Sequence, residues 1–401
     1  MRHTVSMASD PIVIVGAART PMGSFQGELS SVPAPQLGAA AIKAALQRAG
    51  IPPDAPDEVI MGCVLPAGMR QAPARQAAHG AGMPRDVPCT TINKMCGSGM
   101  KAAMMAHDAL AAGGATVAIA GGMESMSNAP YLLTKARNGY RLGNDAVYDH
   151  MFIDGLEDAY EKGKLMGSFA EDTAEKYQFT RAAQDDFAIT SLTRAQKATA
   201  DGTFATEIVP VTVASRKGEA VVSQDEQPRT ADAAKIPKLK PAFREGGTVT
   251  PANSSSISDG AAALVMMRAS EAEKRGLTPL AVIRAQASHA QEPAWFTTAP
   301  IGAMKKALER AGWSKDQVDL YEINEAFAVV TMAAMRDLGL PHDKVNVHGG
   351  ACALGHPVGA SGARIIVTLI NALKKYGLKR GVAALCIGGG EATAMAIERM
   401  S

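Results

Sequence analysis

Two cysteines far apart in the sequence lie in similar glycine-rich surroundings, and a histidine lies between them. Cys96 is followed by Gly-Ser-Gly, Cys386 is followed by Ile and three glycines, and His356 stands between Gly355 and Pro357. Thiols attack thioesters readily, histidine moves protons near neutral pH, and glycines let a substrate carbonyl approach backbone N–H donors. Together these residue types indicate acyl transfer.

Each thiol also has a purely structural interpretation. Cys96 stands where a loop meets a helix predicted to start near Gly97. A helix N-terminus favours negative charge, so we expect the pKa of Cys96 to lie below the usual value of about 8.5. The alternative is a buried structural cysteine, the commoner role of this residue type. For Cys386, a core cysteine on a buried strand is an equally good interpretation.

Several polar residues could assist such thiols. His356 lies in a rigid loop before a predicted helix and suits a general base, whereas most other histidines are better interpreted as solvated loop residues. His348 is a second, weaker candidate. Asn324 stands where another predicted helix begins, so it is either an N-cap or an amide that orients a water or polarises a carbonyl.

The segment 229–260 contains candidate contacts for a polar ligand. Its hydroxyl-rich turn, residues 253–260 (NSSSISDG), either holds a polar arm of a ligand or is only a loop. Arg229 and three lysines could contact phosphates, although a solvated loop is the simpler interpretation of each lysine.

Alternating apolar runs and helix-period segments predict an α/β fold. Strands are expected near 13–16, 58–62, 115–120 and 381–387, and helices over 36–49, 99–112, 301–311, 326–338 and 362–376. The order of loop, helix, strand and glycine turn at 97–122 recurs at 360–390. This indicates two related halves, although chance similarity of two βαβ units would explain the pattern equally well.

Composition excludes several classes of protein. The 401 residues are 47% hydrophobic and 20% charged, with a net charge of +2, so nucleic acid is an improbable main partner. No apolar run reaches the roughly 18 residues of a membrane helix, and the polar start of the chain does not resemble a secretory signal. The five cysteines form no CxxC pair or metal-like cluster, which favours a reducing, cytoplasmic location.

Six segments in order along almost the whole chain resemble the thiolase family. They are residues 16–21 (GAARTP), 93–99 (NKMCGSG), 121–126 (GGMESM), 324–328 (NEAFA), 349–362 (GGACALGHPVGASG) and 386–390 (CIGGG). The resemblance implies the thiolase fold, with two duplicated α/β halves in a layered α/β/α/β/α core. It implies a first half at 1–127, completed by about 248–278, an inserted loop domain at 128–247 and a second half at 279–401.

The resemblance also implies roles for individual residues. Cys96 would be the nucleophile that carries the acyl group, His356 would take its proton, and Cys386 would be the acid/base at the α-carbon. Asn324 with His356 would form one oxyanion hole through an ordered water. The backbone N–H groups of Cys96 and Gly388 would form the other.

The implied reaction is reversible, ping-pong Claisen condensation or thiolysis, with two acetyl-CoA giving acetoacetyl-CoA and CoA. No metal or redox cofactor is implied, and the family predicts a homo-oligomer, dimeric or tetrameric. Ser255 and Arg229 match CoA-contacting positions, and Met166 matches a residue near the acyl group. Alternatives are a degradative thiolase of broad chain length, a decarboxylating ketoacyl synthase, which typically has histidine in place of Cys386, and an inactive binding protein.

Four departures from the family pattern concern the substrate. Residues 165–167 read Leu-Met-Gly where acetoacetyl-CoA-type members usually have His-Met-Gly. Residues 253–257 add bulk beside the expected pantetheine path, and 292–298 (EPAWFTT) bring aromatics that could shape the acyl pocket. Glu391 after the last glycine is also unusual. The implied catalytic residues are all present.

Overall fold

The computed structural model describes residues 10–215 and 218–400, so the outermost ends of the two predicted halves, 1–9 and 401, lie outside the described residues. The main sheet contains β1 (Ile12–Arg19), β2 (Gly23–Ser24), β3 (Glu58–Gly62), β4 (Cys89–Ile92), β5 (Val117–Ser125), β10 (Ser258–Arg268), β11 (Ala281–Ala290), β12 (Leu320–Ile323), β13 (Arg380–Ile387) and β14 (Glu391–Arg399). Two hairpins pair β6 (Tyr131–Leu132) with β7 (Tyr148–Asp149), and β8 (Val211–Ser215) with β9 (Gly218–Val222).

The described residues form eleven α-helices, and each of the five predicted ranges matches one of them to within about two residues. They are α1 (Ala34–Ala49), α2 (Pro73–Gly80), α3 (Ser98–Ala112), α4 (Met166–Tyr177), α5 (Arg181–Ala200), α6 (Glu226–Thr230), α7 (Ala269–Lys274), α8 (Ala299–Ala311), α9 (Ala328–Leu338), α10 (Ala351–Leu354) and α11 (Ser361–Lys375). Glycine ends several of them: Gly113 after α3 and Gly339 after α9 adopt left-handed φ values of 78° and 62°. In the part of the chain that is described, no helix is long and apolar enough to cross a membrane.

The main sheet consists of two sets of strands with the same pairing pattern. In the order β3-β5-β10-β1, the successive pairs are parallel, antiparallel and antiparallel, and the order β12-β13-β14-β11 repeats this sequence of pairs. A short pairing of β1 with β11 joins the two sets. The predicted duplication is therefore confirmed.

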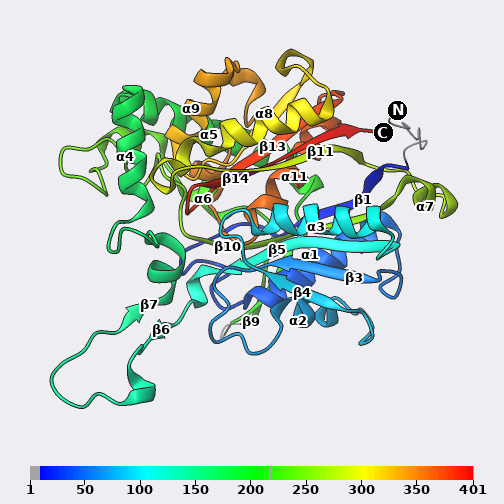
Figure 1. Ribbon diagram of the computed structural model, residues 1–401, viewed down its shortest axis with the longest axis horizontal. Coiled ribbons are helices and arrows are strands. Elements are labelled where there is room, and N and C mark those ends of the chain that lie inside the picture. The colour runs from blue at the N-terminus through cyan, green and yellow to red at the C-terminus, as the bar shows by residue number, and fades with distance from the viewer. Residues whose placement is uncertain (1–9, 216–217, 401) are drawn as a thin grey trace, which may run out of the picture.

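The predicted five-layered core is confirmed as well. Helices α3 and α11 lie between the two sets of strands, and Met100, Ile366, Leu264 and Leu385 belong to the buried cluster that fills this middle layer (Figure 1). A second cluster joins α1 and α2 to the outer face of the first set, and a third joins α8 to the outer face of the second. Because each central helix packs on both sets, the two halves share one core.

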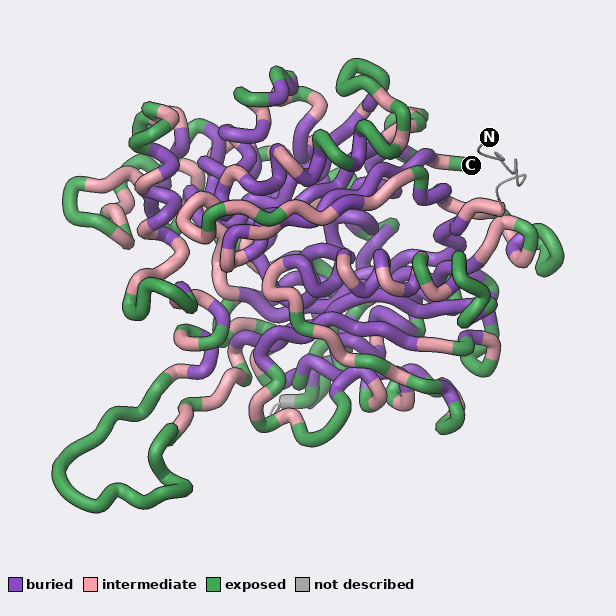
Figure 2. The backbone as a smooth tube through the Cα atoms, viewed as in Figure 1, coloured by how far each residue is buried: buried purple, intermediate pink, exposed green. Residues whose placement is uncertain are grey.

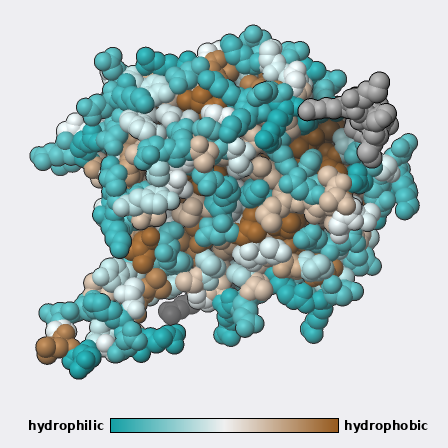
Figure 3. Space-filling view, viewed as in Figure 1, coloured by the Kyte–Doolittle hydropathy of each residue, from teal (hydrophilic) through white to brown (hydrophobic). Residues whose placement is uncertain are grey.

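The segment predicted as an inserted loop domain, 128–247, contains α4, α5 and an arm that projects from the body between β6 and β7 (Figure 1). Its exact bounds stay a prediction. The arm is exposed along almost its whole length (Figure 2), and hydrophobic side chains lie at its outer end (Figure 3). Leu142 in this arm is 97% exposed. Leu133, Tyr140 and Val147 of the same arm are exposed as well, and several exposed apolar side chains in one segment are typical of a contact surface.

Candidate active site

The candidate residues gather where parallel strands of both halves end. Cys96 follows β4, Asn324 follows β12, and Cys386 is the last residue but one of β13. His356 lies in the loop before α11, one of the two central helices. The carboxyl ends of parallel strands form the usual ligand-binding edge of α/β sheets. The fold thus brings residues from the first and second halves to one place.

Cys96 lies at the wall of a cavity of about 530 Å³ that His356 and Gly388 also line. Its turn places Met95 in the left-handed region at φ 47°, and Asn93 Oδ1 accepts a hydrogen bond from the Met95 N–H at 2.9 Å. Gly97 is the N-cap of α3. The nucleophile candidate therefore stands at a helix start, as predicted.

The predicted lowering of the Cys96 pKa is wrong. Burial raises the pKa of Cys96 to about 11, although the backbone N–H groups of Gly388 and of Cys96 itself oppose the shift. Desolvation of the thiolate outweighs those N–H groups. Cys96 is consequently a thiol at neutral pH, and a nucleophilic role would need a base.

His356 is arranged to be that base. It is 6% exposed, and its Nδ1 lies 2.5 Å from Ser361 Oγ, while Ser361 Oγ also donates to the Pro357 carbonyl at 3.1 Å. Because the Ser361 hydroxyl donates its proton to the Pro357 carbonyl, it accepts a hydrogen bond from His356 Nδ1–H. His356 Nε2 therefore keeps its lone pair. His356 Nε2 has no protein partner. Burial lowers the pKa of His356 to about 3, with a smaller effect from Arg364, so the ring is neutral.

Cys386 lies behind the cavity wall in an apolar cluster with Phe296 and Phe327. It is fully buried, and burial raises its pKa well above the usual value. A charged Cys96 would raise that pKa further. A thiolate formed here would be a strong base.

Asn324 is fully buried, and both polar atoms of its side chain lack a protein partner. Its backbone N–H donates to the Ala384 carbonyl at 3.0 Å, which fixes it beside β13. The N-cap interpretation is wrong, because α9 begins only at Ala328 and Phe327 is its N-cap. Unpaired buried amides are costly, so this side chain is suited to bind a water or a substrate atom.

Met166 and Ser255 also line the cavity, as the resemblance implies. A side chain on Gly388 would contact Met166 Sδ at 3.4 Å, so Met166 lies directly over the candidate oxyanion donor. The hydroxyls on either side of Ser255 are engaged within the protein: Ser254 donates to the Thr250 carbonyl and Ser256 bonds Gln227. The hydroxyl-rich turn is therefore a built part of the cavity wall.

Two candidates lie away from this cavity. Arg229 is bound to Glu28 and to the Asp225 carbonyl, and it lines a separate cavity of about 330 Å³. His348 packs between Phe204 and Tyr376, with ring centroids 6.1 and 5.5 Å away. His348 is thus a core histidine, and the structure does not bring Arg229 to the thiols.

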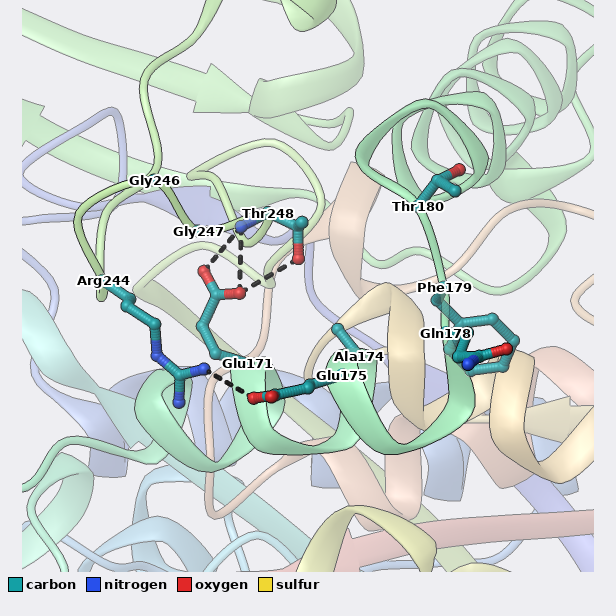
Figure 4. Close-up of a pocket in the computed structure, with 10 residues that line it drawn as sticks. All are labelled: Glu171, Ala174, Glu175, Gln178, Phe179, Thr180, Arg244, Gly246, Gly247 and Thr248. Atoms are coloured by element: carbon teal, nitrogen blue, oxygen red, sulfur yellow. Dashed lines mark hydrogen bonds and ion pairs between the residues drawn. The ribbon is translucent and has the colours of Figure 1, made fainter.

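Another cavity, of about 510 Å³, lies beside α4 (Figure 4). Its acidic residues are occupied with the protein's own groups. Glu171 accepts N–H bonds from Thr248 and Val249, and Glu175 binds Arg244. These contacts hold the turn at 244–249, which leads into the hydroxyl-rich wall, so the carboxylates have a structural role.

Sequence reasoning missed two buried residues that support the site. Ser361, which sets the tautomer of His356, lies in the glycine-rich segment 349–362. Its position five residues after a histidine was the available signal. Glu124 at the end of β5 accepts N–H bonds from Val64, Leu65 and Gly359. A glutamate at the end of an apolar strand was its signal.

The comparison with family models agrees with this site. The thiolase N-terminal domain matches residues 12–270, and the thiolase C-terminal domain matches residues 277–399. The chain belongs to the thiolase family. Together the two matches cover almost the whole chain in the order expected for a thiolase.

Individual thiolase relatives are similar over nearly their full length. Acetyl-CoA acetyltransferase 2 of Arabidopsis thaliana is 53% identical, covering 99% of this chain and 100% of the relative. An acetyl-CoA acetyltransferase of Cupriavidus necator is 50% identical, with 97% and 99% covered. The cytosolic acetyl-CoA acetyltransferase of Mus musculus is 50% identical, with 98% and 100% covered. The crystal structure of the Bacillus anthracis acetyl-CoA acetyltransferase superposes with a TM-score of 0.95 at 42% identity, covering 97% of this chain and 98% of that one.

Proposed function

We propose that this thiolase joins two acetyl-CoA molecules into acetoacetyl-CoA and CoA, and catalyses the reverse thiolysis. The observation that carries the proposal is the placement of Cys96, His356 and Gly388 on one cavity, with the buried Cys386 packed in the cluster that includes the lining residues Phe296 and Phe327. The near-complete similarity to acetyl-CoA acetyltransferases supports the same reaction.

In the first half-reaction, Cys96 Sγ attacks the acetyl carbonyl while His356 Nε2 takes the thiol proton. The resulting oxyanion is held by the N–H groups of Cys96 and Gly388, the same groups that favour the thiolate. The C–S bond to CoA then breaks, and Cys386 gives its proton to the leaving CoA thiolate. Acetyl-Cys96, protonated His356 and the Cys386 thiolate remain.

In the second half-reaction, the Cys386 thiolate removes an α-proton from the second acetyl-CoA. The carbanion attacks acetyl-Cys96, and the Cys96 thiolate is expelled and recovers its proton from His356. Both thiols and the neutral imidazole are thereby restored, so the cycle balances without a metal or redox cofactor, and we propose that none is used. Asn324 and His356 Nε2 would bind a water that holds the enolate oxygen. This role would give hydrogen-bond partners to side-chain atoms of both residues that have none within the protein.

The cavity has an aromatic wall beside Cys386. Phe296 and Phe327 line it together with Met166, and Phe296 is held edge-on by Phe169 with ring centroids 6.3 Å apart. We infer that an acyl chain directed at this wall would have to displace packed rings if it were longer than acetyl. On this basis the acetyl group is the preferred acyl unit, and the broad-chain degradative thiolase is the second candidate.

A thiolysis panel of 3-ketoacyl-CoA substrates of increasing chain length tests the proposal. We expect kcat/KM to be highest for acetoacetyl-CoA and to fall by at least about tenfold for long chains, because each would need the aromatic wall to move. Faster cleavage of long chains would favour the degradative alternative. Condensation that requires malonyl thioesters would instead favour a ketoacyl synthase.

The remaining contacts of CoA are proposed from the family pattern. Ser255 would face the pantetheine arm, since it lines the cavity. Arg229 would contact the adenine side, which requires the nucleotide to extend beyond the cavity toward α6. The net charge of +2 leaves nucleic acid an improbable partner.

We also propose a homo-oligomer located in the cytoplasm, with the arm between β6 and β7 contacting a second copy. Apolar side chains of the arm are widely exposed: Tyr131 is 68%, Val147 57% and Leu133 54% accessible. Large exposed apolar patches mark association surfaces. The cytosolic mouse and rat relatives support the location.

A further inference from the structure

An ion pair joins the loop that carries Cys96 to the turn that carries Gly388. Lys94 Nζ contacts Glu391 Oε2, with side chains 25% and 38% exposed. Lys94 is two residues before Cys96, and Glu391 is three residues after Gly388. The two segments come from opposite sets of strands, since one follows β4 and the other begins β14 (Figure 1).

On the first side, Lys94 belongs to the rigid turn of the nucleophile. Its carbonyl accepts a hydrogen bond from the Gly97 N–H at 3.0 Å, and its N–H donates to Ser98 Oγ at 2.8 Å. The left-handed Met95 follows directly. Movement of the Lys94 backbone would therefore move Cys96.

On the second side, Glu391 closes the glycine turn. Ile387 and Glu391 are paired residues of β13 and β14, so the turn 388–390 spans only the gap between them. Gly389 and Gly390 have φ values of 89° and 88°. These are conformations that glycine adopts easily, and the turn is also held on its far side, where the Gln291 N–H donates to the Gly390 carbonyl at 2.8 Å.

The two segments touch closely beside the thiol. A Cβ atom added at Gly97 would lie 2.4 Å from Ile387 Cδ1, so the Cys96 loop and the end of β13 are closely packed at this point. The Gly388 N–H acts on Cys96 Sγ across this contact. A small displacement of the turn would change how that N–H faces the thiol and its acyl group.

We propose that Lys94 and Glu391 are positioning residues that hold the Gly388 turn against the Cys96 loop, so that both backbone N–H groups face one oxyanion. The inference deepens the proposed function and rests on it. Misplacement of a reacting group by about 1 Å can cost 10²-fold in rate, so a modest ion pair is enough to matter.

The experiment compares Lys94→Met, Glu391→Gln and the charge swap Lys94→Glu with Glu391→Lys. Arg275→Gln is the matched control, because it breaks an ion pair with Glu271 on the remote α7. Two readouts are the pH profile of Cys96 alkylation by iodoacetamide and the rate of acetyl-Cys96 formation from acetyl-CoA, followed by mass spectrometry. Thermal unfolding of each variant checks its fold, and Lys94→Gln and Glu391→Ala, which also remove the ion pair, replace any variant that does not fold.

Positioning predicts that both single variants shift the alkylation profile to higher pH and slow acetylation about tenfold, with KM changed less than about twofold. The charge swap should recover most of the rate. A plain charge effect on the thiolate predicts opposite shifts for the two variants, and that result would overturn the proposal, as would profiles equal to the control. If the wild type forms no acetyl-Cys96, the proposed function fails while alkylation still decides the role of the ion pair.

Discussion

At the scale of single residues, the two thiols differ from ordinary catalytic cysteines because neither is ionised at rest. Burial raises the pKa of both Cys96 and Cys386, while burial lowers that of His356. All three groups are therefore neutral in the free enzyme. In the proposed mechanism, charges arise in pairs, a thiolate together with an imidazolium, only when substrate is being converted.

This neutrality predicts how Cys96 reacts with iodoacetamide. Because the pKa of Cys96 is raised to about 11, the alkylation rate should climb through about pH 9 without levelling off. The rate is measured by mass spectrometry of the modified peptide, with Cys96→Ala as the blank. A plateau below about pH 8 would mean that the thiolate is stabilised more strongly than its burial allows.

Cys386→Ala should separate the two half-reactions. Cys96 would still be acetylated by acetyl-CoA, more slowly because the leaving CoA lacks its proton donor. Exchange of the acetyl α-protons with deuterated solvent should fall by about 10²-fold or more, since no base remains near the α-carbon. Nuclear magnetic resonance of the recovered acetyl-CoA measures the exchange. Wild-type exchange in this variant would place the base elsewhere.

At the scale of elements, Glu124 links the ends of strands β3 and β5 to the loop that carries His356. At the end of β5 it accepts N–H bonds from Val64 and Leu65 after β3, and from Gly359 in the loop before α11. Burial raises its pKa from 4.5 to about 7, although these N–H groups oppose the shift. One carboxyl group thus ties a loop of the first half to a loop of the second.

Glu124→Gln should lower the free energy of unfolding by about 1–3 kcal/mol, because the amide group cannot accept all three N–H bonds. The carboxyl group of Glu124 binds its proton more tightly in the folded state than in the unfolded chain, because its pKa is higher in the folded state. The stability that Glu124 contributes is therefore present below pH 4.5 and is lost as pH rises through about 7.

The decrease in the free energy of unfolding that Glu124→Gln causes, measured by denaturant unfolding, should thus be larger near pH 5.5 than near pH 8. These two pH values lie on either side of the Glu124 pKa of about 7. Glu309→Gln on the exposed face of α8 is the control. An equal loss at both pH values would exclude titration of Glu124 in this range.

Elements were predictable where one local pattern decides the structure. Periodicity located α1, α3, α8, α9 and α11 to within about two residues, and the repeated motif order indicated the duplicated halves. The start of α9 was misplaced because Asn324 resembles a cap, whereas tertiary pairing of its backbone with β13 determines its conformation. The pKa of Cys96 was misjudged because burial, which reverses the effect of the helix N-terminus, is not visible in a local pattern.

At the scale of the whole molecule, the arm between β6 and β7 stands apart from the shared core. Replacing Leu133, Leu142 and Val147 by Ser should reduce the assembled mass, because these exposed side chains supply apolar contact area. Light scattering measures the mass, and acetylation of Cys96 should persist. Val221→Ser, which changes a 65% exposed residue on another hairpin, is the control. If the variant has the same assembled mass as the wild type, the arm does not contribute to the interface between copies.

The neutral resting thiols have one more consequence, for survival under oxidative stress. Peroxides attack thiolates far faster than thiols, so a cysteine whose pKa is about 11 is oxidised slowly at neutral pH. The sulfenic acid that would inactivate the nucleophile and join it to its neighbour therefore forms slowly in the empty enzyme. In the proposed mechanism, burial makes Cys96 depend on a base for every turnover, and the same burial protects Cys96 between turnovers.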